Sequence, residues 1–286
     1  MTGFPTPGTF LLERLIDDGR LLYWDFKIDK EDDGSWHPEL SLSQLPVSFS
    51  IGGKMNSLTE PGLKQLRDNV MLIGGEVGRS VERAMQALIS RDSLLAEQVL
   101  TEGNRIDALE LESDHLGICV LALRAPKARD LRFVVSASKI ISRLKRIRDQ
   151  ACTIARAAIN FNNQAPVRLH RDLPQMAVEV AEMLHYSLIA FANADAEAAR
   201  AIIERDHQIG RLYERLSQEL LEVATWNPEM AGHATRLILM ANHLLQIGDC
   251  TKEICQQIVY MKEACVIKNH RPWVQMSKCR VSNYMN

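Results

Sequence analysis

The sequence predicts an all-α protein in which two tandem three-helix-bundle repeats pack as one elongated helical bundle. First, apolar residues recur every three or four positions from about residue 60 onward, which is typical of helices with one buried stripe. Second, turn residues and prolines divide this region into two similar sets of three long segments. Third, the Ile-x-Asp sequence that ends at Asp149 recurs at Asp249. A period near 100 residues indicates an internal duplication.

Residues 1–54 differ in composition from the rest of the chain. Glycine and proline interrupt them repeatedly, as in Gly52-Gly53. We interpret this segment as an irregular or disordered N-terminal extension. Tyr23 to Ile28 could form a short strand, but no partner strand is obvious. Met55 directly precedes the first helical segment, which leaves open that translation starts there.

The first predicted repeat spans residues 55–163. Its first helix opens at Pro61, and a second, with Asp92 or Ser93 as N-cap, runs to about Leu123. Pro126 opens the third helix, because a missing N–H costs nothing in a first helical turn. The apolar stripe of this third helix consists of Phe133, Ala137, Ile140, Leu144, Ile147, Ala151 and Ile154.

The second predicted repeat spans residues 164–262. Asp172 with Pro174 marks the start of its first helix, and Asp195 caps its second. Asn227-Pro228 begins its last helix. Short turns make neighbouring helices antiparallel, so we expect each half to be an up-down-up bundle that packs on the other half. Residues 263–286 are expected to form an irregular tail.

Composition narrows the possible functions. The chain has 46% hydrophobic residues, 24% charged residues and a net charge of −2, which is typical of a globular protein without a nucleic-acid footprint. No apolar run approaches the roughly 20 residues of a membrane span. The six cysteines lack metal-ligand spacing. We find no nucleophile elbow, P-loop, GxGxxG or HExxH motif. We therefore expect a cytoplasmic protein that is neither an enzyme nor inserted in a membrane.

Carboxylates recur at corresponding places in the two repeats. Asp107 and Glu110 are neighbours on one face of the second helix, and Asp149 on the third helix could lie opposite them. Hard divalent cations and iron take such oxygen ligands. The candidates of the second repeat are Asp206, Glu214 and Asp249.

Cations are concentrated on the third helix of the first repeat. The candidate partner-binding residues are Arg132, Lys139, Arg143, Lys145, Arg146 and Arg148. One interpretation is a solvated face that pairs with the acidic second helix. The alternative is a docking strip for an acidic partner surface or for phosphate.

The two repeats, the Arg-Ala-Pro…Ala-Arg-Asp-Leu-Arg corner that ends at Arg132 and the paired Ile-x-Asp helices resemble the PhoU family of phosphate-signalling proteins. The resemblance covers about residues 58–262. It implies a cytosolic homodimer that restrains the phosphate-specific transporter and the sensor kinase through contacts with the transporter's cytosolic subunits and the kinase. It also implies metal binding, which many members achieve with Glu/Asp-x-x-x-Asp on each third helix and acidic residues on the second.

The sequence departs from this metal motif in both repeats. Lys145 and Leu245 stand where the family has the glutamate of Glu-Arg-Ile-Gly-Asp. Of the two acids that the family places four apart on the second helix, glycines at 103 and 210 replace one in each repeat. A Lys145–Asp149 pair would also compete with a cation for the aspartate. We therefore predict no firmly held Mg, Mn or Fe.

The function implied by the resemblance is regulation of phosphate homeostasis, in which the protein restrains high-affinity phosphate uptake and starvation signalling through protein contacts. One alternative is a carboxylate-bridged helical-bundle metalloenzyme, which requires Glu-x-x-His pairs on facing helices, and we expect none here. Another is a degenerate paralogue that acts only by dimerising with an intact member of the family.

Overall fold

The chain divides into two compact units, Met1–Asn56 and Ser57–Asn286. The computed structural model describes residues 9–15, 21–30, 36–45, 60–124, 127–163 and 169–267. Of the predicted tail, residues 268–286 lie outside the described residues. The predicted start of the third helix at Pro126 also lies outside them.

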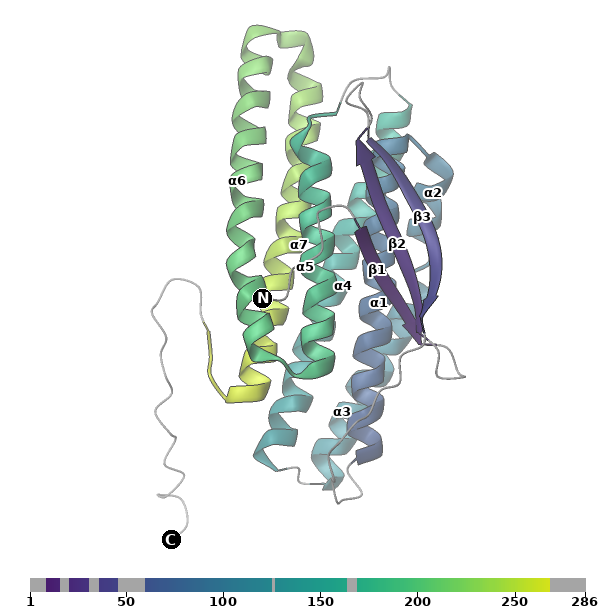
Figure 1. The fold of residues 1–286 in the computed structure, drawn as a ribbon, viewed down its shortest axis with the longest axis vertical. Coiled ribbons are helices and arrows are strands. Elements are labelled where there is room, and N and C mark those ends of the chain that lie inside the picture. Colours follow the sequence, from purple (N-terminus) through teal and green to yellow (C-terminus); the bar gives the residue numbers. More distant parts are fainter. Residues whose placement is uncertain are drawn as a thin grey trace. The chain divides into compact units, whose positions relative to one another are not determined.

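The N-terminal unit contains a three-stranded antiparallel sheet of order β1-β2-β3 (Figure 1). Its strands are β1 (Thr9–Leu15), β2 (Leu21–Lys30) and β3 (Trp36–Leu45). The prediction of an irregular segment is therefore wrong for these ranges. The possible strand from Tyr23 to Ile28 lies in β2 and has a partner on both sides. Pro38, which suggested a break, pairs with Ile28 in an edge strand, where the missing N–H can face away from the sheet.

The second unit is the helical bundle that the stripes predict, with long helices side by side (Figure 1). The first repeat contains α1 (Glu60–Ser90), α2 (Ser93–Thr101), α3 (Asn104–Arg124) and α4 (Ala128–Asn162). The second contains α5 (Asp172–Asn193), α6 (Ala196–Trp226), the 3₁₀ turn η1 (Pro228–Met230) and α7 (Ala231–Glu263). The all-α prediction is confirmed for this unit.

Side-chain caps fix the helix starts that the sequence indicates. Asp92 accepts a hydrogen bond from the backbone N–H of Leu95 at 3.0 Å. Asp195 accepts from the N–H groups of Glu197 and Ala198, both at 3.0 Å. These carboxylates satisfy backbone donors that have no partner inside the helix.

The second helix of the first repeat differs from its prediction. A single helix to about Leu123 is expected, but α2 ends at Thr101 and α3 begins at Asn104. Glu102 and Gly103 form the break. The side chain of Arg148 on α4 lies against Gly103 at this break.

The core joins the two repeats. α4 packs against α1 of its own repeat and against α7 of the other, and Ile140, Leu144 and Ile147 on α4 are fully buried. Gly74 lies where α1 meets α5, because a Cβ there would lie 2.4 Å from Cδ2 of Leu188. The absence of a side chain at Gly74 thus allows α5 to approach α1 closely. Among the described helices, none is long and apolar enough to cross a membrane.

Candidate functional site

The Ile-x-Asp motif places its two residues on opposite sides of a helix, because two residues advance the chain by about 200°. Ile147 and Ile247 are fully buried, whereas Asp149 and Asp249 are exposed. The motif therefore anchors α4 and α7 in the core and presents one carboxylate outward in each repeat.

The acidic cluster of the first repeat is organised around a lysine. Lys145 Nζ on α4 donates to Glu110 Oε2 on α3 and lies 3.5 Å from Asp107 Oδ1. The hydrogen bond to Glu110 is the largest cause of a raised pKa at Lys145. The expected i,i+4 partner of this lysine was Asp149 on its own helix; its contacts are instead with the acids across the α3–α4 interface.

The position of the missing acid in the first repeat is filled by a cation. Arg148 lies so close to Gly103 that a Cβ at this glycine would be 1.5 Å from Nη2 of the guanidinium. A side chain at position 103 would have to displace Arg148. The loss of an acid at position 103 and the arginine at position 148 are thus two parts of one spatial arrangement.

The acidic cluster of the second repeat also contains a lysine. Lys252 Nζ on α7 donates to Asp206 Oδ2 on α6 and lies 3.6 Å from Asp249 Oδ1. Burial lowers the pKa of Lys252, but the hydrogen bond and charge of Asp206, with the charge of Asp249, outweigh it and raise the pKa. Glu214 is exposed and lies about 12 Å further along α6 than Asp206, so it is not part of this cluster.

α6 approaches α7 closely at this point. A Cβ on Gly248 would lie 3.0 Å from Cδ1 of Ile209 and 3.6 Å from Oδ1 of Asp206. This oxygen of Asp206 is buried and has no hydrogen-bond partner among the described residues. The glycine thus accommodates Ile209 at close range beside the carboxylate of Asp206, for which Lys252 supplies the counter-charge.

These donor sets do not fit the metal sites that the family resemblance implies. Among the described residues, His170, Asp172 and Glu219 form the group of three or more ligand-type side chains whose ligand atoms lie within 4.8 Å of one another. Neither Asp107, Glu110 and Asp149 nor the three candidates of the second repeat converge in this way. An ammonium group lies among the carboxylates of both clusters instead.

The group at His170 was not identified from the sequence, and its contacts argue against metal binding. The N–H of Asp172 donates to His170 Nδ1 at 3.2 Å, so the ring proton is on Nε2, which lies 3.0 Å from Glu219 Oε2. Neither ring nitrogen then has a free lone pair for a metal. The buried Asp172 pairs with Arg215 at 2.5 Å. The cluster thus fastens the start of α5 to α6.

The Glu-x-x-His spacing of the metalloenzyme alternative occurs three times in the described helices, at Glu112–His115 on α3, Glu182–His185 on α5 and Glu204–His207 on α6. α3 packs on α1 and α4, whereas α5 packs on α6, α7 and α1. Glu182 accepts from Arg205, and burial lowers the pKa of His185 to about 4. Although α5 and α6 pack together, Glu204 and His207 are exposed, and none of these pairs forms a shared ligand group among the described residues.

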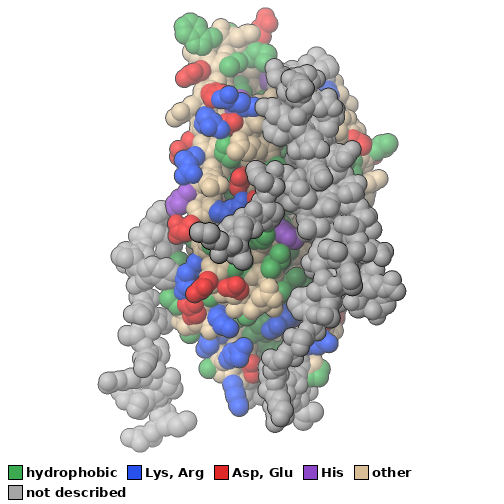
Figure 2. Space-filling view, viewed as in Figure 1, with side chains coloured by type: hydrophobic (Ala, Val, Ile, Leu, Met, Phe, Trp, Pro, Cys, Tyr) green, Lys and Arg blue, Asp and Glu red, His purple; other side chains and the backbone are tan. Residues whose placement is uncertain are grey.

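The cations of the predicted basic strip face different neighbours. Arg143 Nε pairs with Glu253 Oε2 on α7 at 2.5 Å, whereas Lys145 and Arg148 lie against the α2–α3 side. Lys139 and Arg146 are exposed, and Arg132 is half-buried. On the face shown in Figure 2, cations and carboxylates alternate along α6. The six cations therefore do not share one continuous surface.

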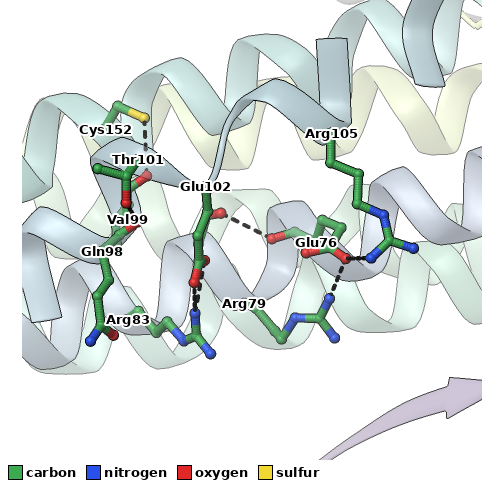
Figure 3. Close-up of polar contacts among 10 residues, drawn as sticks. Glu76, Arg79, Arg83, Gln98, Val99, Thr101, Glu102, Arg105 and Cys152 are labelled. Carbon is green, nitrogen blue, oxygen red and sulfur yellow. Dashed lines mark hydrogen bonds and ion pairs between the residues drawn. The ribbon is translucent and has the colours of Figure 1, made fainter. Parts of the chain in front are cut away.

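A polar network holds α1 to the break between α2 and α3 (Figure 3). Arg83 Nη1 donates to both carboxylate oxygens of Glu102, at 2.6 and 2.8 Å. Glu76 Oε1 lies 2.6 Å from Arg79 Nη2 and 3.4 Å from Arg105 Nη1. Arg83 on α1 holds Glu102 at the break, and Glu76 on α1 holds Arg105 just after it. These charged pairs fix where the α2–α3 break lies against α1.

Comparison with known proteins matches both repeats. The family model "PhoU domain" matches residues 70–158 and 173–258. The "Phosphate-specific transport system accessory protein PhoU homolog" of Pseudomonas aeruginosa is 31% identical over 201 residues, which cover 70% of this chain and 83% of the relative. The "Phosphate-specific transport system accessory protein PhoU" of Escherichia coli is 29% identical over 219 residues. The aligned region covers 77% of this chain and 89% of the relative.

Solved structures agree with these relatives. The crystal structure of PhoU from Pseudomonas aeruginosa aligns with a TM-score of 0.68 and 31% identity, over 71% of this chain and 97% of that one. The crystal structure of the phosphate transport system regulatory protein PhoU from Streptococcus pneumoniae aligns with a TM-score of 0.66 and 28% identity, over 73% and 99%. Two matched repeats, a shared bundle and relatives above 30% identity together show that this chain belongs to the PhoU family.

Proposed function

We propose that this chain is an accessory protein of a phosphate-specific transport system, which restrains high-affinity phosphate uptake and phosphate-starvation signalling. The observation that carries the proposal is the match of both repeats, in sequence and in fold, to proteins named "Phosphate-specific transport system accessory protein PhoU". These relatives are named as accessory or regulatory proteins, which supports a role in binding rather than catalysis.

The proposed mechanism is contact with the transporter's cytosolic subunits and with the phosphate sensor kinase, from the cytoplasm and as a homodimer. Such contact restrains a partner only if the chain binds the restrained state more tightly than the active state. Long helices locked by fully buried stripes suit this role, because they present polar side chains in fixed positions. Lys139 and Arg146 remain candidates for contacts with an acidic partner, since both are exposed on α4.

The test is a pull-down with the full chain from phosphate-replete and phosphate-starved cells, together with phosphate uptake after deletion of its gene. We expect transporter or kinase components in the replete sample and raised uptake in the deletion strain. A control chain with Lys139→Glu and Arg146→Glu should recover less of these components if the exposed cations contribute. Recovery of neither component, with unchanged uptake, would refute the proposal.

The replaced metal ligands favour a second candidate, a degenerate paralogue that acts only by dimerising with an intact PhoU protein. Both clusters carry a lysine at the place where the resemblance implies cation ligands. Co-expression with such a relative, followed by native mass measurement, separates the two functions. A heterodimer that excludes the transporter components favours the paralogue, whereas a homodimer that retains them favours direct regulation.

A further inference from the structure

The lysines of the two clusters do not occupy equivalent positions in the repeats. Lys145 lies four residues before Asp149, whereas Lys252 lies three residues after Asp249. The equivalent of Lys145 in the second repeat is Leu245, and the equivalent of Lys252 in the first is Cys152. The duplication therefore does not account for the presence of a lysine in both clusters.

Each lysine lies opposite the acid that its repeat retains. Position 103 faces Arg148, and Asp206 faces Gly248, so these two positions of the second helices correspond. The first repeat has glycine at this position and retains Asp107 one turn further on, where Lys145 reaches it. The second repeat retains Asp206, which Lys252 reaches from the other side of Asp249. Two different substitutions thus give one result, an ammonium group between carboxylates.

Each ammonium group is held by two carboxylates, as a metal cation would be. The two carboxylates come from successive turns of α3 in the first cluster and from α6 and α7 in the second. Lys145 lies between Glu110 and Asp107, and Lys252 between Asp206 and Asp249. An ammonium group has three N–H donors and a full positive charge, so it can satisfy two carboxylates at once. A divalent cation at the same place would be repelled by this charge and would find its ligand oxygens occupied.

The second cluster is the more enclosed of the two. The side chains of Asp206 and Lys252 are 11% and 16% exposed, whereas those of Asp107 and Lys145 are 54% and 39% exposed. A carboxylate this deep needs a counter-charge, because burial of an unpaired charge is costly. Only Oδ2 of Asp206 meets Lys252; Oδ1 is buried without a hydrogen-bond partner among the described residues.

We propose that Lys145 and Lys252 take the place of bound divalent cations in the two repeats, so that the bundle of this chain is complete without metal. The positive charge is part of the polypeptide, and it is present at any metal concentration. Removal of Lys252 should convert the Asp206–Asp249 cluster into a site for a hard divalent cation such as Mn²⁺.

The test measures Mn²⁺ binding and thermal unfolding of the full chain with and without Mn²⁺, after purification in chelator. The variants are Lys252→Ala, Lys252→Met and Lys145→Ala, with Lys139→Ala as the control for loss of an exposed lysine. The double variant Asp206→Asn, Lys252→Ala removes the ligand as well as the lysine. The isolated protein suffices, so the result is independent of any transport partner.

We expect no saturable Mn²⁺ binding and no change of Tm with Mn²⁺ for the wild-type chain and Lys139→Ala. Lys252→Ala and Lys252→Met should bind Mn²⁺ saturably, and Mn²⁺ should raise their Tm by about 2–4 °C. Lys145→Ala should gain less, and the double variant should gain nothing. Stoichiometric Mn²⁺ in the wild-type chain, or equal Mn²⁺ affinity with and without Lys252, would overturn the proposal.

Discussion

The acidic clusters of the two repeats hold the same kinds of groups but differ in their exposure to solvent. In the first, Lys145 meets its carboxylates at a surface where Asp107 is more than half exposed. In the second, Lys252 meets Asp206 inside the α6–α7 interface, which the glycine at position 248 makes close. The comparison shows that the environment, rather than the pair itself, sets the energetic weight of an ion pair. An exposed pair is weak, whereas removal of one partner of a buried pair leaves an uncompensated charge.

The largest expected effect comes from removal of Lys252, the more enclosed of the two lysines. Lys252→Ala in chelator should lower the free energy of unfolding by about 2–4 kcal/mol, because the largely enclosed carboxylate of Asp206 then loses its counter-charge. Urea unfolding followed by circular dichroism measures it. The double variant Asp206→Asn, Lys252→Ala removes the stranded charge and should recover part of the loss. A loss no larger than that of Lys139→Ala would mean that the two clusters are energetically alike.

The junction between the repeats offers a matched pair of glycines. Gly74→Ala should destabilise the chain by about 1–3 kcal/mol, because its Cβ would overlap the side chain of Leu188 in the core between α1 and α5. Gly75→Ala has no heavy atom within 4 Å of the new Cβ and should stabilise α1 by up to about 1 kcal/mol. Thermal unfolding of both variants measures the difference. The reverse order of Tm values would show that the repeats do not meet at Gly74.

Glu82, in the first repeat, is a carboxyl group whose pKa burial raises more than the nearby cations lower it. Burial raises the pKa of Glu82 on α1 to about 8, and the charges of Arg79 and Arg83 only partly oppose this. Since the folded state holds this proton between about pH 4.5 and pH 8 and the unfolded state does not, stability falls as pH rises through this window. The slope is at most about 1.4 kcal/mol per pH unit.

Glu82→Gln should remove this slope and stabilise the protein most above pH 8. Urea unfolding at intervals from pH 5 to pH 9 measures the effect. Glu222→Gln, on an exposed residue of α6, serves as the control and should leave the pH profile unchanged. A pH–stability profile of Glu82→Gln parallel to that of the wild type would contradict a raised pKa of Glu82 in the folded state.

The smallest expected effect completes the comparison. Lys145→Ala should lower stability by less than about 1 kcal/mol, since its partners stay hydrated when the lysine is removed. Addition of about 0.5 M salt should reduce the stability difference between Lys145→Ala and the wild type further, because salt screens exposed charges. The measurement is urea unfolding at low and high salt. A loss of stability equal to that of Lys252→Ala would show that the two ion-pair clusters contribute equally to stability.

Much of the helical unit could be predicted from the sequence because its determinants are local. Capping by Asp92 and Asp195 depends on residues within one turn, and the stripe from Phe133 to Ile154 is a property of one helix. The contact of Arg148 with Gly103 could not be predicted in this way, since Arg148 comes from another helix. The partners of β2 were missed because strand pairing joins segments whose own patterns, such as that around Pro38, indicate turns.

The features of the candidate site can be divided in the same way, into those that could be predicted from local sequence and those that depend on contacts between helices. Residue types and spacing indicated the acids and predicted that Lys145 would hinder metal binding, whereas the missing glutamates were inferred from the family resemblance. The expected partner Asp149 was the wrong one, and Lys252 was not recognised at all. A lysine side chain reaches across an interface, so its partner depends on how two helices are aligned.

By itself, the sequence determined the helices, their buried stripes, their caps and the duplication, because each depends on the period of one helix or on contacts within a turn. Only the tertiary structure decided that Lys145 meets Glu110 and that Lys252 meets Asp206 inside the second repeat. The axial alignment of packed helices sets which charges lie opposite each other. That alignment is fixed by the whole core and by close approaches such as the one at Gly248, which no single segment encodes.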